Sequence, residues 1–99
     1  PGPLAITALR TQAALSRMRG DLDEAERAQR EALAQLEAGQ NQFDLAVARA
    51  ELAGILSDRG NRTQARALLA KALPVMRASV RETEINRIEA ESLARTLGG

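Results

Sequence analysis

Hydrophobic and polar residues follow one another along most of this chain with a helical period. Apolar side chains recur at intervals of three, four and seven positions, whereas a half-buried strand would place them at every second position. Each such stretch therefore predicts a helix with one apolar face that packs against a neighbour. The three clearest stripes consist of Leu22, Ala25, Ala32, Leu33 and Leu36, of Leu45, Ala48, Leu52, Ile55 and Leu56, and of Ala65, Leu68, Leu69, Ala72, Leu73 and Met76.

The stripes and the residues at their boundaries predict five helices, over residues 4–18, 22–38, 43–58, 62–80 and 84–97. Gly39 ends the second helix, and Asn41 or Asp44 begins the third. Pro74 falls inside the fourth helix, where a residue without a backbone N–H predicts a kink or an early end. The apolar side of the fifth helix is formed by Ile85, Ile88, Leu93 and Leu97.

The chain also repeats itself at an interval of forty residues. The segment RGDLDEA at residues 19–25 is echoed by RGNRTQA at residues 59–65. An internal period of about 20 to 50 residues is typical of helical-repeat proteins. A shift of forty places superposes Ala13 on Ala53, Leu15 on Ile55, Gly20 on Gly60, Ala25 on Ala65, Ala32 on Ala72 and Leu33 on Leu73.

The two echoed segments have the composition of a bend between helices. Gly20 and Gly60 each follow an apolar stripe, where a glycine can adopt the left-handed conformation that ends a helix. The next residue, Asp21 or Asn61, has the short oxygen-bearing side chain of an N-cap, which contributes about 1 kcal/mol. The tripeptide Arg19-Gly20-Asp21 could also suggest cell adhesion, but the second copy lacks the Asp and keeps the capping pattern. We therefore interpret Arg19-Gly20-Asp21 as a bend that ends one helix and begins the next.

Several of these residues resemble the tetratricopeptide repeat (TPR), a helical hairpin that stacks into a right-handed solenoid. The resemblance implies an all-α fold of two hairpins plus a final helix, with a period longer than the common repeat of about 34 residues. The aromatic positions of the usual pattern are filled here by Leu9, Ser16, Gln29, Leu56 and Leu69. The residues that carry the resemblance are the bend glycines, the alanines five positions later, Leu52-Ala53, Ala32-Leu33 and Ala72-Leu73.

The resemblance implies that the first, third and fifth helices line a concave groove that holds a peptide or a partner's helix. Arg10 and Arg17 could grip an acidic peptide or a carboxylate there through their forked donors, or they are solvated surface residues. The candidate partner-binding residues are Thr7, Arg10, Ala14, Arg17, Met18, Val47, Ala50, Gly54, Ser57 and Asp58.

Composition narrows the range of functions. Cysteine and histidine are both absent, which removes thiolate chemistry and the commonest general base and metal ligand. Acid pairs such as Asp21 with Asp23, or Glu89 with Glu91, point in different directions on a helix. We therefore predict a non-catalytic protein–protein interaction module without a cofactor. A net charge of +1 and one aromatic residue, Phe43, make nucleic acid an improbable partner.

Charge is unevenly distributed between the second and fourth helices, which the resemblance places on the convex side. Residues 21–40 contain six acids and two bases, whereas residues 61–80 contain four bases and no acid. Arg62, Arg66, Lys71 and Arg77 could thus meet an acidic partner or the acidic helix of another copy, or simply face solvent. A homodimer is the alternative function, in which a second copy buries the apolar stripe of the final helix.

The chain begins with Pro1-Gly2-Pro3 rather than with Met. We interpret residues 1–3 as a cloning scar and residues 4–99 as one TPR-like domain from a larger protein. No apolar stretch approaches the roughly 20 residues needed to cross a bilayer, and no secretory signal is visible. The expected setting is cytoplasmic, with a protein or peptide partner and no membrane.

Overall fold

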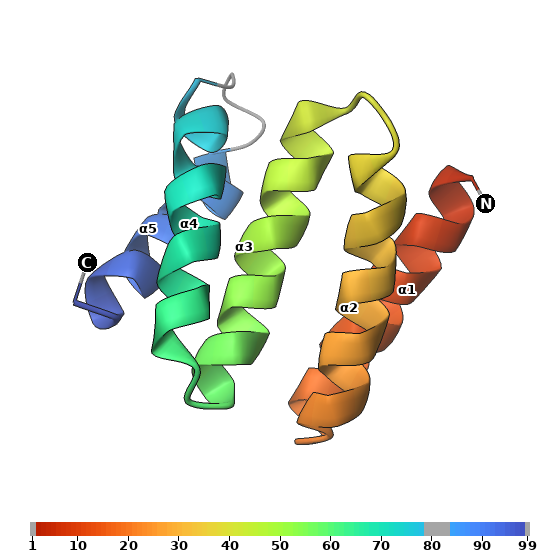
Figure 1. Cartoon of the computed structure of the whole chain (residues 1–99), viewed down its shortest axis with the longest axis horizontal. Helices are drawn as coiled ribbons and strands as arrows, with labels where there is room; N and C mark the ends of the chain where they lie inside the picture. Colours follow the sequence, from red (N-terminus) through yellow and green to blue (C-terminus); the bar gives the residue numbers. More distant parts are fainter. Residues whose placement is uncertain (1, 79–83, 99) are drawn as a thin grey trace.

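A computed structural model describes residues 2–78 and 84–98. Within these ranges the chain forms five helices and no strand (Figure 1). The helices are α1 (Pro3–Met18), α2 (Leu22–Glu37), α3 (Gln42–Asp58), α4 (Arg62–Arg77) and α5 (Glu84–Thr96). The all-α prediction is confirmed, and most helix ends fall within one residue of those expected. None of the described helices is long and apolar enough to cross a membrane.

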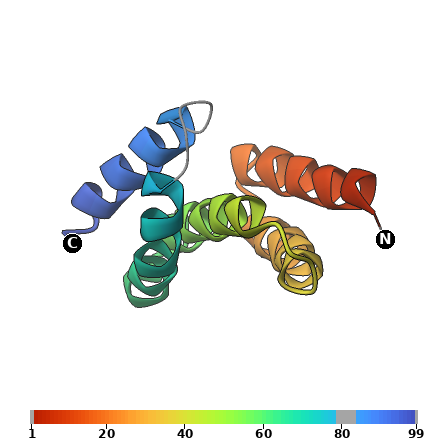
Figure 2. The same cartoon turned by 90° about the horizontal axis from the view of Figure 1, so that it is seen from above.

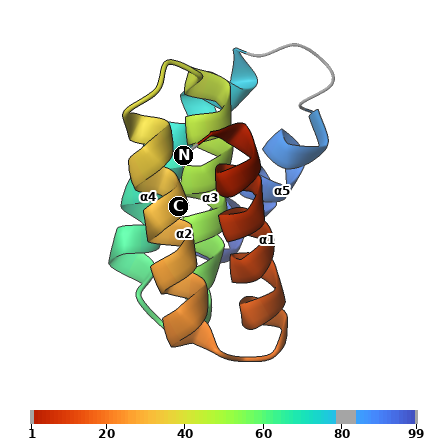
Figure 3. The same cartoon turned by 90° about the vertical axis from the view of Figure 1, so that its right-hand side faces the viewer.

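Consecutive helices pack against one another along the whole chain, from α1 on α2 to α4 on α5. Seen from above, α1 and α5 stand on one side of α3, and α2 and α4 extend on the other (Figure 2). Figure 3 shows the same division from the side of α1. The helix in the middle, α3, therefore has neighbours on most of its circumference, and its buried residues lie on several faces.

The bends after α1 and α3 have the same geometry. Gly20 and Gly60 adopt φ angles of 81° and 85° in the left-handed region. In each bend the glycine N–H donates to the carbonyl three residues back, and the next N–H donates to the carbonyl five residues back, at distances of 2.8 to 3.0 Å. This is the Schellman arrangement, which satisfies carbonyls at the end of a helix. The predicted equivalence of the two bends is confirmed.

The helices that follow these bends begin with the predicted caps. Asp21 Oδ1 accepts from the Glu24 N–H at 3.2 Å, and Asn61 Oδ1 accepts from the Gln64 N–H at 3.3 Å. The third helix begins in the same way, because Asn41 Oδ1 accepts from the backbone N–H of Asp44 at 3.0 Å. Asn41, rather than Asp44, is therefore the N-cap of α3.

Pro74 does not end α4 at once. The helix continues for three residues to Arg77, where the N–H of Ala78 donates to the Pro74 carbonyl at 3.2 Å. Pro74 and Ala70 are both exposed, so the carbonyl that loses its helical donor lies on the solvent side. The described helix is shorter than the predicted range of 62–80, of which residues 79 and 80 lie outside the described ranges.

Small side chains dominate the contacts between helices. Leu52, Leu56, Leu69, Met76 and Leu97 are the largest hydrophobic side chains that are fully buried. Between them lie alanines that let the helix axes approach closely, which suits a core with one aromatic residue. The alanines with no exposed surface are Ala25, Ala28, Ala32, Ala46, Ala48, Ala53, Ala65 and Ala72.

The final helix is anchored to α4 at its C-terminal end. Leu97 is buried, and its backbone carbonyl accepts from Arg62 Nη2 at 3.1 Å and from Arg66 Nε at 3.2 Å. Two cations therefore lie at the negative end of the α5 dipole. Part of the apolar stripe predicted for a second copy is thus covered by the chain itself. Leu93 is half-buried and Ile88 is exposed, while the side chain of Ile85 lies outside the described part.

Candidate binding groove

The side of the molecule that carries α1 and α5 is hollowed by two adjoining cavities. The larger, of about 450 Å³, lies between α1 and α3, and the smaller, of about 260 Å³, lies between α3 and α5. Arg17, Glu51 and Glu89 line both cavities, so the two form one continuous depression, which we call the groove. Its floor is α3 and its walls are α1 and α5.

A two-pronged ion pair joins the α1 wall to the floor. Arg10 Nε lies 2.8 Å from Glu51 Oε1, and Arg10 Nη2 lies 2.9 Å from Glu51 Oε2. The hydrogen bonds with Glu51 raise the pKa of Arg10 above its usual value. Because both side chains are partly shielded from water, this contact is stronger than an ordinary surface pair.

A second ion pair repeats this contact two helical turns further along. Arg17 Nε lies 2.5 Å from Asp58 Oδ2, and Arg17 Nη2 lies 3.3 Å from Asp58 Oδ1. Arg17 follows Arg10 by seven residues, and Asp58 follows Glu51 by seven, so one face of α1 is matched to one face of α3. Both arginines proposed to grip an acidic ligand are therefore neutralised within the chain.

A buried glutamine fixes the carboxylate at the centre of the groove. Gln29 of α2 is only 1% exposed, and its Nε2 donates to the Ala48 carbonyl at 3.0 Å and to Glu51 Oε1 at 3.1 Å. One oxygen of Glu51 thus accepts from both Gln29 and Arg10. The carboxylate is held from two helices, which fixes the direction in which it faces the groove.

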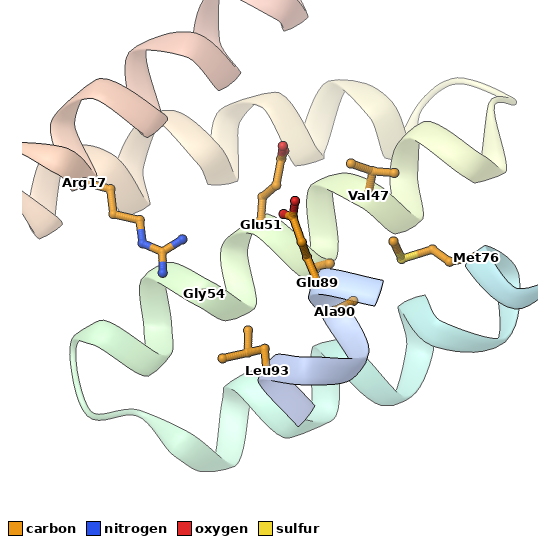
Figure 4. A pocket seen from close by; sticks show the side chains of 9 residues that line it. Arg17, Val47, Glu51, Gly54, Met76, Glu89, Ala90 and Leu93 are labelled. Atoms are coloured by element: carbon orange, nitrogen blue, oxygen red, sulfur yellow. The ribbon is translucent and has the colours of Figure 1, made fainter. Parts of the chain in front are cut away.

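The α5 wall contributes one acid and apolar surface. Figure 4 shows the side chains that line the smaller cavity, with Glu89 and Leu93 from α5, Glu51 and Val47 from α3 and Arg17 from α1. Glu89 is exposed and makes no hydrogen bond or ion pair with any described residue. The groove therefore combines neutralised pairs, an apolar floor and one unpaired carboxylate.

Most of the predicted partner-binding residues line this groove. Thr7 instead lines a separate hollow near the N-terminus, and half-buried Ser57 lines neither cavity. Arg10, Ala14, Arg17, Met18 and Asp58 line the larger cavity. Val47, Ala50 and Gly54 line the smaller one, again with Arg17. The groove is also lined by residues that were not predicted: Ala13, Gln29, Glu51, Ile55, Met76, Glu89, Ala90 and Leu93.

One signal in the sequence could have revealed Glu51. The seven-residue spacing of Arg10 and Arg17 on the first predicted helix recurs in Glu51 and Asp58 on the third. Opposite charges with equal spacing on neighbouring helices can pair in register. No comparable pattern marks Glu89 or Leu93, because the position of α5 depends on its packing against α4.

The basic residues of α4 are mostly engaged within the chain. Arg62 and Arg66 hold the carbonyl of Leu97, and Arg77 Nε lies 2.7 Å from Glu91 Oε2. Hydrogen bonding with Arg77 lowers the pKa of Glu91. Three of the four residues that could meet an acidic partner therefore have local partners, and Lys71 shows none among the described residues.

The acids of α2 are matched by arginines in the same way. Arg59 pairs with Asp23 at 2.6 Å and with Glu26 at 3.3 Å, and so ties the bend after α3 to α2. The full set of pairs is Arg59 with Asp23 and Glu26, Arg27 with Glu24 and Glu31, Arg30 with Glu26, and Arg49 with Glu37.

No group of three or more acidic side chains that could hold a metal ion occurs in the described part of the chain. Comparisons with protein-family models, with curated proteins and with solved structures found no match to this chain.

Proposed function

We propose that this chain is a non-catalytic, TPR-like scaffold module that binds a peptide or a helix of a partner protein in the groove. The observation that carries the proposal is the continuous depression lined by α1, α3 and α5, in which three residues belong to both cavities. In this reading the module serves a larger protein by holding a partner, and its setting is cytoplasmic.

The equivalence of the two halves supports the repeat interpretation. The bends at Gly20 and Gly60 share their φ angles and hydrogen bonds, and each leads into a side-chain cap. Repeats of this kind stack so that corresponding helices share one face, which gives an extended surface for binding. A right-handed TPR-like solenoid is therefore the fold that we propose for the all-α arrangement.

The surface of the groove suits a polypeptide ligand. Val47 and Ala50 provide apolar surface on the floor, and half-buried Leu93 provides it on the α5 wall. Charged side chains surround this surface and are already oriented by their mutual bonds, so little side-chain entropy is lost when a ligand enters. An apolar centre within a polar rim is the usual organisation of a protein interface.

The proposal is tested by narrowing the groove without changing its charge. Ala50→Gln places a longer neutral side chain in the smaller cavity, whereas Ala70→Gln places the same side chain on an exposed position of α4 outside both cavities. An array of random-sequence peptides is probed with the wild-type chain and with both variants. We expect that the peptides bound by the wild-type chain do not bind the Ala50→Gln variant and still bind the Ala70→Gln variant.

The scaffold function is contradicted if the wild-type chain retains no peptide, or if both variants retain the same set as the wild type. Circular dichroism on each variant shows that a lost signal does not reflect unfolding.

Self-association is a second candidate, favoured by apolar side chains at the two ends of the helix stack. Leu15 is 50% exposed and Met18 82% exposed on α1, and Ile88 is 52% exposed on α5. In the second half of the chain the position equivalent to Leu15 is Ile55, which packs against Ala25 and Ala28 of α2. Light scattering over a range of concentrations tests this function, because a constant monomer mass would exclude it.

A further inference from the structure

We infer that the groove selects a basic ligand: a Lys or Arg side chain of the partner enters the smaller cavity and pairs with Glu89. This inference rests on the proposed groove function and names the chemistry of its occupant. It reverses the expectation that Arg10 and Arg17 would make the groove a site for an acidic peptide.

The ionised side chains of the groove do not balance one another. Arg10 and Arg17 line it, but Glu51 and Asp58 neutralise them one for one. Glu89 adds a third carboxylate without a matching cation, so the five groups carry a net charge of −1. An arriving acidic side chain would have to break one of two existing ion pairs, whereas a cation finds a carboxylate free to accept it.

Glu89 differs from the other acidic side chains that the structure describes. Among the acidic side chains that the structure describes, those of α2 pair with arginines or cap the helix, and Glu91 pairs with Arg77. Asp44 accepts from Asn41 Nδ2 at 2.9 Å. Glu89 alone among them has no partner, although the chain carries 14 basic residues. Its unpaired carboxylate stands at the groove and not on the outer surface.

The surface around the Glu89 carboxylate suits a long cationic side chain. Val47, Met76 and Leu93 line the same cavity, and Glu51 lines it as well (Figure 4). Lys and Arg combine a long apolar stem with a charged end, so the stem can cover the apolar floor while the charge meets the Glu89 carboxylate.

The test compares two short fluorescent peptides, one built from Lys, Ala and Leu and one with Glu at every Lys position. Binding to the full chain is measured by fluorescence anisotropy at low and moderate salt. We expect the Lys peptide to bind at least about tenfold more tightly than the Glu peptide. Added salt should weaken the binding of the Lys peptide, because part of its affinity for the groove is electrostatic.

The decisive variant is Glu89→Gln, which removes one charge from an exposed residue that has no partner among the described residues, so the fold should stay intact. It is expected to weaken binding of the Lys peptide about three- to tenfold. Glu37→Gln is the matched control, because Glu37 is exposed on α2, lies outside both cavities and pairs only at 3.9 Å with Arg49. It should leave the affinity unchanged.

Three results would overturn the inference: equal or tighter binding of the Glu peptide, no binding of the Lys peptide, or equal effects of Glu89→Gln and Glu37→Gln. The scaffold function is judged separately by Ala50→Gln. If Ala50→Gln abolishes binding of an acidic peptide, the groove binds peptides but does not select basic ones. If no peptide responds to Ala50→Gln, the groove function itself fails.

Discussion

The guanidinium of Arg17 lies directly against Gly54, so that a Cβ atom at residue 54 would stand 2.6 Å from Arg17 Nη1. Gly54 lies within α3, where glycine is less favourable than alanine by about 0.5 to 1 kcal/mol. Its absence of a side chain gives Arg17 the room to reach Asp58. Glycine at this position therefore lowers the stability of α3 but makes room for the second ion pair between α1 and α3.

Replacing Gly54 by Ala is expected to raise the free energy of unfolding by about 0.5 kcal/mol, since the gain in helix propensity exceeds the loss from a weakened, half-exposed ion pair. In an Arg17→Ala background the same replacement should give the full gain of about 1 kcal/mol. Urea unfolding of the four proteins provides a double-mutant cycle. Equal gains in both backgrounds would show that Arg17 does not lie on Gly54.

The two bend glycines offer a test of the internal repeat. Gly20→Ala and Gly60→Ala each force a Cβ-bearing residue into the left-handed region, which costs about 1 to 2 kcal/mol. Open space surrounds both positions, so the cost is conformational and should be similar at the two sites. Thermal or urea unfolding measures it directly.

Gly39→Ala serves as the matched control for these variants. Gly39 also follows a helix, but its φ angle is not positive, and an added Cβ would meet the Leu36 carbonyl at an ordinary distance of 3.6 Å. This variant should therefore leave stability nearly unchanged. A cost at Gly20 without a comparable cost at Gly60 would contradict the equivalence of the two bends.

Helix positions and helix ends were predictable because the signals for them are local. Gly20 needs no distant contact to end α1, and Asp21 caps α2 through an N–H three residues away. The groove was only half predictable. Arg10 was expected on it and lines the larger cavity, but its partner Glu51 lies 41 residues away on α3, and a single sequence does not state which charges meet.

The contacts of the final helix, α5, were likewise not predictable from the sequence. Its apolar stripe was visible, but its burial depends on where α5 packs, and the cations that hold Leu97 come from α4. Arg62 and Arg66 looked like a surface for an acidic partner because local sequence does not show that a helix end lies beside them. Glu89 was missed for this reason, since its place on the groove follows from that anchoring.

Ser16 provides a stability prediction with the opposite sign to most core substitutions. Its side chain has no exposed surface, and its hydroxyl has no hydrogen-bond partner among the described residues. A buried hydroxyl without a partner costs about 1 to 3 kcal/mol relative to its hydration in the unfolded chain. Ser16→Ala removes this cost and gains helix propensity, so we expect stability to rise by about 1 kcal/mol.

Ser92→Ala is the matched control, because Ser92 is exposed on α5 and the same replacement there alters stability only through propensity, by about half as much. Urea unfolding measures the free energy of unfolding of both variants relative to the wild type. A loss of stability in Ser16→Ala would mean that the hydroxyl is satisfied in solution.

The ion pair between α4 and α5 predicts a dependence on pH. Hydrogen bonding with Arg77 lowers the pKa of Glu91 in the folded chain. A carboxylate whose folded pKa lies below its unfolded value stabilises the fold above the unfolded pKa, and this contribution is lost as pH falls through the folded one. The difference in stability between the wild type and Arg77→Gln should therefore be present at neutral pH and shrink as pH falls below the usual Glu pKa of about 4.3. Unfolding by urea at a series of pH values measures this difference, and added salt should reduce it because both side chains reach solvent. Lys71→Gln removes one charge from the same helix at a position without a described partner, so its effect should not vary across this pH range. If both variants showed the same pH dependence, the loss of a positive charge on α4, and not the contact with Glu91, would be the cause.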